Sequence, residues 1–324
     1  MRTGFWSHIK TPAFVMGPMA NVTDAAFRRL IAKYSKPAGP AAMFTEFVSV
    51  EGLLSAGRKR LLSDFWYTEA ERPIVAQVFG GKPEQFREVA ELVNELGFDG
   101  IDINMGCPDR AVERSGAGAA LMKDPTRAAQ IIRETKAGAG ALPVSVKARI
   151  GYNKNELDTW LPALLAEGPA SVTLHLRTRK EMSDVPAHWE LAEQTLAIRD
   201  RADSSATKPL ILGNGDVYTI AEAEEKVRQY GVDGVMFGRG IFGQPWLFSG
   251  KSEPDLKKRL RIMVEHTELF EELFKDIKSF NVMKKHCKAY AHGFRGANEL
   301  RAKLMDTESA AEMRTIVEKF ILGL

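Results

Sequence analysis

Residues 210–238, LILGNGDVYTIAEAEEKVRQYGVDGVMFG, contain one complete unit of the pattern that decides the fold. An apolar run, Leu210–Gly213, is followed by an amphipathic stretch, Ile220–Tyr230, which stops at Gly231. A second apolar run, Gly234–Gly238, comes next. Short apolar runs bounded by turn residues are typical of buried strands, and an amphipathic stretch with a glycine stop is typical of a helix. The segment therefore predicts a strand, a helix and a second, parallel strand.

The same alternation extends over residues 12–248. Further helical stretches are Pro83–Leu96 and Pro125–Lys136, and Asp124 is placed to cap the second one ahead of its proline. Eight strands alternating with helices predict a (β/α)8 TIM barrel, with a doubly wound open sheet as the alternative. The predicted strands are Phe14–Pro18, Ala42–Glu46, Ile74–Phe79, Gly100–Asn104, Val144–Ala148, Ser171–His175, Leu210–Gly213 and Gly234–Gly238.

The pattern changes after Pro245. Residues 254–322 carry no strand signal and show long helical periodicity instead, so we expect a small all-helical domain after the barrel. Lys251–Pro254 is the predicted linker. The expected units are therefore a barrel over residues 1–250 and a helical domain over residues 251–324.

Length and composition exclude several classes of protein. The chain has 324 residues, 44% of them hydrophobic, which excludes global disorder. The longest uncharged run, residues 11–23, is shorter than the roughly 20 apolar residues that span a bilayer, and the N-terminus lacks the apolar core of a secretory signal. With two cysteines and no cluster at metal-ligand spacing, we expect no disulfide framework, no metal site and a cytoplasmic location.

Positive charge is concentrated near the C-terminus. The chain as a whole carries +3, but residues 275–303 hold eight basic and two acidic residues, a local charge of +6. Such a window predicts either an anionic partner or a solvated helix face, and charge alone does not choose between them.

Polar residues and glycines end most of the predicted strands. The active site of a barrel lies at these carboxyl ends, so a ligand site is predicted there. Gly213-Asn-Gly-Asp216 and Gly238-Arg-Gly240 follow the last two strands, where barrels often bind phosphate; two tight turns are the alternative. Gly238-Arg-Gly-Ile-Phe-Gly243 also matches a dinucleotide fingerprint, but no strand follows it, so we interpret Gly243 as a turn or packing residue.

Three strand-end residues are candidates for chemistry. Lys147 could form a Schiff base or act as a cation beside an anionic ring, and His175 could donate to a carbonyl or a phosphate. Cys107, between Gly106 and Pro108, could be a nucleophile or a general acid. Cys287 is interpreted as structural.

Taken in order, these motifs resemble the tRNA-dihydrouridine synthases over about Phe14 to Leu304. The motifs that carry the resemblance are Pro18-Met-Ala-Asn-Val-Thr-Asp24, Ala76-Gln-Val-Phe-Gly80, Asp102-Ile-Asn-Met-Gly-Cys-Pro108, Ser145-Val-Lys-Ala-Arg149, His175-Leu-Arg-Thr-Arg179, Gly213-Asn-Gly-Asp216, Gly238-Arg-Gly240 and, in the helical segment, Met283-Lys-Lys-His286, Tyr290, Phe294-Arg-Gly and Glu299-Leu-Arg301.

The resemblance implies that FMN, reduced by NADPH, delivers hydride to a uridine of tRNA to form 5,6-dihydrouridine, with Cys107 as the proton donor. We also expect a monomer. The cofactor-binding residues it implies are Pro18, Met19, Ala20 and Gln77 along the flavin ring, Asn104 near the flavin or the base, Lys147 and His175 at the ring edge, and Asn214, Gly215, Asp216, Gly238 and Arg239 at the ribityl-phosphate end. RNA would contact Lys284, Lys285, Lys288, Arg295 and Arg301.

Two features depart from the family pattern. Leu176 stands where a glycine usually follows the histidine, and Glu181–Pro186 lacks the usual glycine-containing loop. The other functions compatible with the residues are a flavin-dependent barrel reductase of a small molecule such as a dihydroorotate or an enoate, a dihydrouridine synthase of another RNA, a Schiff-base lyase that uses Lys147, and a non-catalytic RNA-binding protein.

Overall fold

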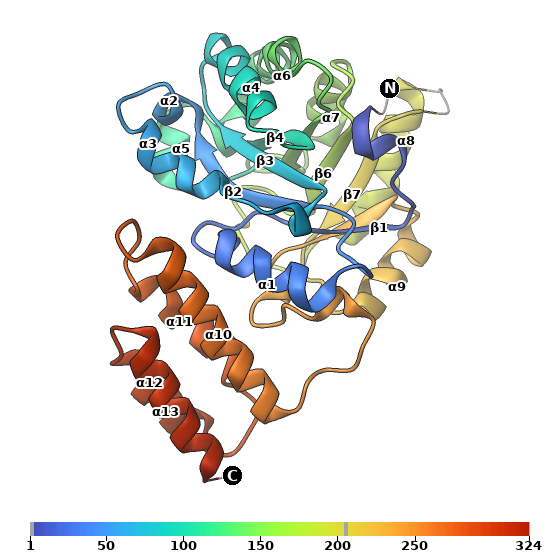
Figure 1. Ribbon diagram of the computed structural model, residues 1–324. Helices are drawn as coiled ribbons and strands as arrows, with labels where there is room; N and C mark the ends of the chain where they lie inside the picture. The colour runs from blue at the N-terminus through green and yellow to red at the C-terminus, as the bar shows by residue number, and fades with distance from the viewer. Residues whose placement is uncertain (1–2, 204–206, 324) are drawn as a thin grey trace.

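The computed structural model describes residues 3–203 and 207–323 and has a closed barrel of eight parallel strands in sequential order (Figure 1). This confirms the predicted TIM barrel and excludes the open sheet. The strands are β1 Ala13–Met16, β2 Met43–Ser49, β3 Ile74–Phe79, β4 Gly100–Met105, β5 Val144–Arg149, β6 Ser171–His175, β7 Leu210–Asn214 and β8 Gly234–Phe237.

Helices cover the outside of the barrel, with their apolar faces against the strands. They are α1 Ala25–Ser35, α2 Val50–Leu53, α3 Arg58–Leu61, α4 Phe86–Glu95, α5 Arg110–Arg114, α6 Pro125–Ala139, α7 Leu157–Leu165, α8 Ala192–Ala202 and α9 Ile220–Tyr230. The predicted end signals are present. The Asp124 carboxylate accepts from the Arg127 amide at 3.0 Å, and Gly231 ends α9 at φ +72°.

Several predicted boundaries differ from the structure by one to three residues. The helix expected from Pro83 starts with a 3₁₀ turn, Pro83–Gln85, before α4. β2 extends three residues further than predicted, with a register irregularity between Phe44 and Phe47. β1 ends at Met16, because Pro18 has no N–H to continue the ladder after the Gly17 amide bonds to the Phe237 carbonyl at 2.8 Å.

From Leu256 to Leu322 the regular elements are helices: α10 Leu256–Phe274, α11 Asn281–Tyr290, α12 Ala297–Met305 and α13 Ala310–Leu322. They share a core that includes Leu260, Met263, Leu304 and Val317. Cys287 belongs to this core and lies 3.4 Å from the Met313 sulfur, as expected of a structural cysteine.

The helical region packs against the barrel along α1, and α10 runs beside α1 in Figure 1. Ala25 and Ala26 share an apolar cluster with Phe270 and Phe274. The Phe27 ring stacks on His266 with centroids 5.2 Å apart. The two parts of the chain are therefore joined by a packed interface as well as by the linker.

Gly243 lies at this interface, at φ +72°. A Cβ on Gly243 would come within 2.4 Å of the Ala289 carbonyl oxygen of α11. Gly243 is therefore a turn and packing residue, as predicted. The segment that follows β8 is a 3₁₀ turn, Arg239–Ile241.

Within the described parts of the chain, no helix is long and apolar enough to cross a membrane. The same residues contain no group of three or more His, Cys, Asp or Glu side chains placed to hold a metal ion.

Candidate functional site

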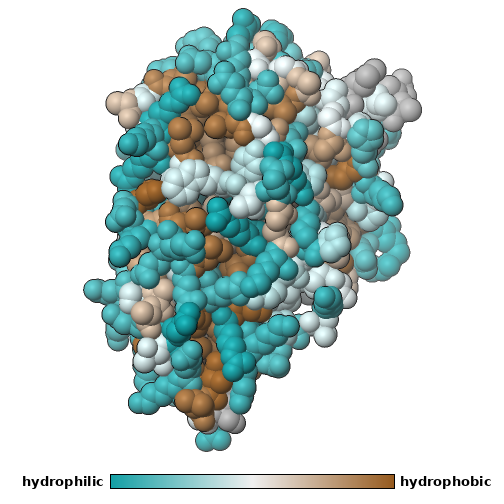
Figure 2. Space-filling model, viewed as in Figure 1, coloured by the Kyte–Doolittle hydropathy of each residue, from teal (hydrophilic) through white to brown (hydrophobic). Residues whose placement is uncertain are grey.

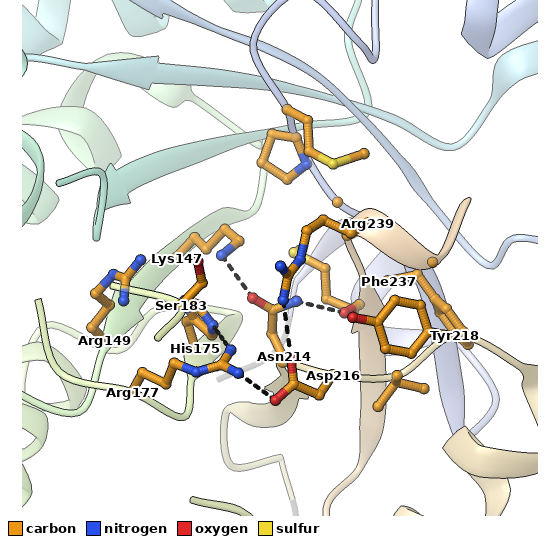
Figure 3. A pocket seen from close by; sticks show the side chains of 18 of the residues that line it. Lys147, Arg149, His175, Arg177, Ser183, Asn214, Asp216, Tyr218, Phe237 and Arg239 are labelled. Atoms are coloured by element: carbon orange, nitrogen blue, oxygen red, sulfur yellow. Dashed lines mark hydrogen bonds and ion pairs between the residues drawn. The ribbon is translucent and has the colours of Figure 1, made fainter. Parts of the chain in front are cut away.

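A cavity of about 310 Å³ opens at the carboxyl ends of the strands (Figure 3). Four cationic side chains and one carboxylate line it, so the lining carries a net positive charge. This composition favours an anionic ligand. The lining residues used below are Pro18, Met19, Pro108, Lys147, Arg149, His175, Arg177, Met182, Asn214, Gly215, Asp216, Tyr218, Gly238, Arg239 and Gly240.

A smaller cavity of about 140 Å³ adjoins the first and is lined by Cys107 and Asn104. The two cavities have five lining residues in common, which places the cysteine beside the larger cavity. The shared residues are Pro18, Pro108, Lys147, Arg149 and His175.

The turn that carries Cys107 is held by the side chain of Asn104. The Asn104 Oδ1 accepts from the Gly106 amide at 3.1 Å and from the Cys107 amide at 3.0 Å. Burial raises the pKa of the Cys107 thiol, so the thiol keeps its proton at neutral pH. A protonated thiol is suited to a general acid and poorly suited to a nucleophile.

Lys147 projects from β5 toward Asn214, and its Nζ donates to Asn214 Oδ1 at 3.1 Å (Figure 3). Asn214 is held in turn by the bond from its Nδ2 to the Met236 carbonyl at 2.8 Å. Burial, aided by the nearby charge of Arg149, lowers the pKa of Lys147 to about 8. The ammonium is therefore charged at pH 7 and has donors to spare for a ligand.

His175, Arg177, Asp216 and Arg239 form a second network. The Arg177 Nη1 lies 3.1 Å from His175 Nε2. Because a guanidinium only donates, His175 Nε2 is the acceptor and Nδ1 carries the proton. Burial and the surrounding cations lower the pKa of His175 well below its usual value, so the imidazole is neutral.

Asp216 connects two arginines in that network. It pairs with Arg177, and its Oδ1 accepts from Arg239 at 3.1 Å. Burial acts to raise the pKa of Asp216, but the bonds from Arg177 and the Ala187 amide outweigh it and the pKa is lowered. The ionised carboxylate thus orients Arg239 at the mouth of the cavity.

Two glycines border the same end of the cavity. A Cβ on Gly238 would have no closer neighbour than the Asn214 Nδ2 at 3.9 Å, so the backbone there faces open space. A Cβ on Gly215, at φ +128°, would instead meet Ala187 at 2.7 Å. Gly238 allows a ligand to approach the backbone closely, whereas Gly215 is required by its conformation and packing.

Two residues expected along the flavin ring line neither cavity. Ala20 is exposed. Gln77 is fully buried below Asn104, whose Nδ2 donates to the Gln77 Oε1 at 3.1 Å. Their contact with a flavin stays a prediction, while Pro18 and Met19 do line the larger cavity.

The sequence motifs at the ends of β5 and β6 include Arg149 and Arg177, but sequence reasoning assigned neither arginine a role in the site. Arg149 donates to the Gly106 carbonyl at 2.9 Å and to the Thr178 carbonyl at 2.9 Å, so it joins the cysteine turn to the loop after β6. The available signal was spacing: Arg149 follows Lys147 by two positions, which puts both side chains on one face of β5.

The predicted RNA-binding residues lie on α11 and α12 and on the loop between them. Lys285, Lys288 and Arg295 are exposed, whereas Arg301 donates to the Ala291 carbonyl at 2.6 Å. On the face seen in Figure 2, hydrophilic side chains cover most of the helical region. Lys278, counted in the +6 window, instead lies at the barrel interface between two carboxylates.

The chain matches the family described as Dihydrouridine synthase over residues 15–322. It is 42% identical to a probable tRNA-dihydrouridine synthase of Staphylococcus aureus, over 99% of this chain and 96% of that protein. It is 40% identical to the probable tRNA-dihydrouridine synthase 2 of Bacillus subtilis, over 99% of this chain and 97% of that protein.

Among solved structures, a 2-naphthoyl-CoA reductase is similar with a TM-score of 0.51 and 11% identity, over 72% of this chain and 49% of that one. Histamine dehydrogenase from Rhizobium sp. 4-9 has a TM-score of 0.50 and 13% identity, over 72% of this chain and 45% of that one. At such identities the likeness concerns the fold alone.

Proposed function

Because the chain belongs to the dihydrouridine synthase family, and is thus an oxidoreductase, we propose that it reduces the C5–C6 bond of a uridine in tRNA with FMN and NADPH. Cys107 is the proton donor in this proposal. The observation that carries it is that the cationic cavity shares five lining residues with the smaller cavity beside the Cys107 turn. Family membership removes the Schiff-base lyase and the non-catalytic RNA-binding protein as alternatives.

The residues of the larger cavity fit FMN. Its phosphate requires cations and close approach to the backbone, and Arg239 and Gly238 provide both at the end of β8. Asp216 supports this end by orienting Arg239. Lys147 and the neutral His175 would face the ring edge, and Asn214 holds the Lys147 ammonium in place.

Bound FMN would supply the hydride that uracil C6 accepts. The proton for C5 would come from the Cys107 thiol, which the buried turn keeps protonated until it is needed. The thiolate left behind lies in the field of Lys147 and Arg149, both of which favour the charged sulfur. A proton from solvent would then restore the thiol.

The barrel, residues 1–250, would hold FMN, and the helical region, residues 251–324, would bind RNA. Lys284 and Lys288 are four residues apart on α11 and share a face. Lys285 Nζ lies 3.5 Å from the carbonyl of Ala20, and Met19, the residue before Ala20, lines the larger cavity. A backbone bound along α11 would therefore bring RNA to the cavity. The target uridine must leave its stack to enter it.

The test replaces each cysteine in turn and measures the two half-reactions separately. Cys107→Ala should keep its flavin and its reduction by NADPH, but single-turnover oxidation by tRNA should slow by about 10²–10⁴-fold. Cys287→Ala is the matched control, since it removes a buried thiol far from the cavity and should leave both rates unchanged.

If tRNA oxidised the reduced flavin of Cys107→Ala at a rate within a few-fold of that of the unmodified protein, Cys107 would not be the proton donor. Release of FAD, or no flavin after reconstitution, would overturn the cofactor assignment.

A further inference from the structure

A chain of hydrogen bonds runs across three strands beneath the cavity and ends at the turn that carries Cys107. Asp102, 1% exposed, is paired in register with Gln77 of β3 and with Ser145 of β5. Its Oδ2 accepts from Gln77 Nε2 at 2.6 Å, and its Oδ1 accepts from Ser145 Oγ at 2.6 Å. Gln77 Oε1 then accepts from Asn104 Nδ2 at 3.1 Å, and Asn104 Oδ1 accepts from the turn amides.

The direction of this chain is determined at both of its ends. A carboxylate only accepts, so Gln77 must turn its NH₂ toward Asp102 and its oxygen toward Asn104. Asn104 must then turn its NH₂ toward Gln77 and its oxygen toward the backbone N–H groups of Gly106 and Cys107. A reversed chain would place the Asn104 NH₂ against two N–H donors, which repel it.

The chain of hydrogen bonds begins at Asp102, which is not in contact with the cavity. Asp102 lines neither cavity, and burial raises its pKa to about 6 against the opposing effect of the Ser145 and Gln77 hydrogen bonds. A polar group buried so deeply costs free energy unless it is fully bonded, and here both carboxylate oxygens have donors. Filling the buried space at position 102 does not by itself require a carboxylate, because an apolar side chain next to apolar neighbours would fill it as well.

We propose that Asp102 is a positioning residue for proton transfer: as an acceptor it sets the orientation of Gln77 and Asn104, and through them the conformation of the Cys107 turn. The proposal rests on the proposed function, in which Cys107 is the proton donor. Ser145 has a supporting role, since it directs the second oxygen of Asp102 away from Gln77.

The test compares Asp102→Asn with Asp102→Leu in the FMN-loaded protein. Both substitutions remove the charge, but Asn retains an oxygen that accepts from Gln77, while its NH₂ donates to the Ser145 hydroxyl. In Asp102→Asn, tRNA should therefore oxidise the reduced flavin at a rate within about threefold of that of the unmodified protein. In Asp102→Leu the same rate should fall by about 10–100-fold, since small misplacements of reacting groups have effects of this size. Reduction of the flavin by NADPH should be unchanged in Asp102→Asn.

A second measurement reports on the turn independently of catalysis. The rate of Cys107 alkylation by iodoacetamide, followed by mass spectrometry with buried Cys287 as the internal reference, should rise about tenfold in Asp102→Leu and stay unchanged in Asp102→Asn. A tenfold rise corresponds to the loss of about one hydrogen bond from the local equilibrium.

Ser145→Ala and Ser171→Ala form a matched pair, because the two serines are register partners on β5 and β6. Ser145 donates to Asp102, whereas within the described residues the Ser171 hydroxyl has no hydrogen-bond partner. Ser145→Ala should slow oxidation by tRNA about threefold, and Ser171→Ala should not. This pair decides the question if Asp102→Leu does not fold.

Equal losses in Asp102→Asn and Asp102→Leu would show that charge, and not orientation, is what the site needs, and would overturn the proposal. An unchanged alkylation rate in Asp102→Leu, or equal effects of the two serine variants, would do the same. A changed alkylation rate together with full activity of Cys107→Ala would leave the positioning intact and refute the proposed function instead.

Discussion

We expect Lys278 to stabilise the interface between the helical region and the barrel. Its Nζ lies 2.6 Å from Glu46 Oε2 and 2.7 Å from Asp64 Oδ1. The side chains of Lys278, Glu46 and Asp64 are 14%, 7% and 20% exposed, so solvent screens the ion pairs only weakly. Removing the shared cation leaves the partly buried carboxylates of Glu46 and Asp64 without their common ion-pair partner.

Replacing Lys278 by Met keeps the length and most of the packing of the side chain. Loss of one partner from a buried ion pair costs about 3–5 kcal/mol, and we expect the lower end because each group keeps some exposure. For a chain of 324 residues, a loss of about 3 kcal/mol lowers Tm by about 4 °C.

Lys33→Met is the matched control, because Lys33 also pairs across the interface, with Glu265 at 2.6 Å. The Lys33 side chain is 59% exposed, so its loss should cost at most about 1 kcal/mol and shift Tm by about 1 °C. Scanning calorimetry of the FMN-loaded proteins measures both shifts. Adding Glu46→Gln and Asp64→Asn to Lys278→Met should recover more than half of the loss, since no unpaired charge remains. A Tm for Lys278→Met equal to that of Lys33→Met would refute the reasoning.

Three further predictions concern the cofactor and the RNA. Arg239→Ala should weaken FMN binding about tenfold, as judged by fluorescence titration, because a charge-assisted phosphate contact is lost; unchanged affinity would place the phosphate elsewhere. Affinity for FMN should fall as pH rises through about 8, where Lys147 in the free protein loses its proton and with it the attraction for an anion, and Lys147→Met should flatten this dependence in the same titration. Replacing Lys284, Lys288 and Arg295 by Gln should weaken tRNA binding and reduce the slope of log K against log salt by about 1 per lost phosphate contact, while FMN binding stays the same; an unchanged slope would exclude these side chains as the phosphate contacts.

The barrel and its site were predictable because the signals that define them are local. Apolar runs of four to six residues identify the strands, and cap residues such as Asp124 and Gly231 mark helix ends, whatever the rest of the chain does. Parallel strands in a closed barrel all present their carboxyl ends at one face, so residues as distant as Cys107 and Arg239 could be assigned to one site. The resemblance to a family then implied what that site does.

The amino-acid sequence by itself thus determined the fold class, the face that carries the cavities and many of the residues that line them, since each depends on residue type and short-range spacing. Only the tertiary structure decided the partners of the polar side chains. Lys278 lies in a basic window, yet it is paired with two barrel carboxylates. Gln77 lies near the carboxyl end of β3, yet it is buried under Asn104, and Arg177 is bound to Asp216 instead of being free for a ligand. The physical reason is that a charged or amide side chain binds whichever complementary group the strand register and the packing of distant helices bring within about 3 Å, and that neighbour lies tens or hundreds of residues away along the chain.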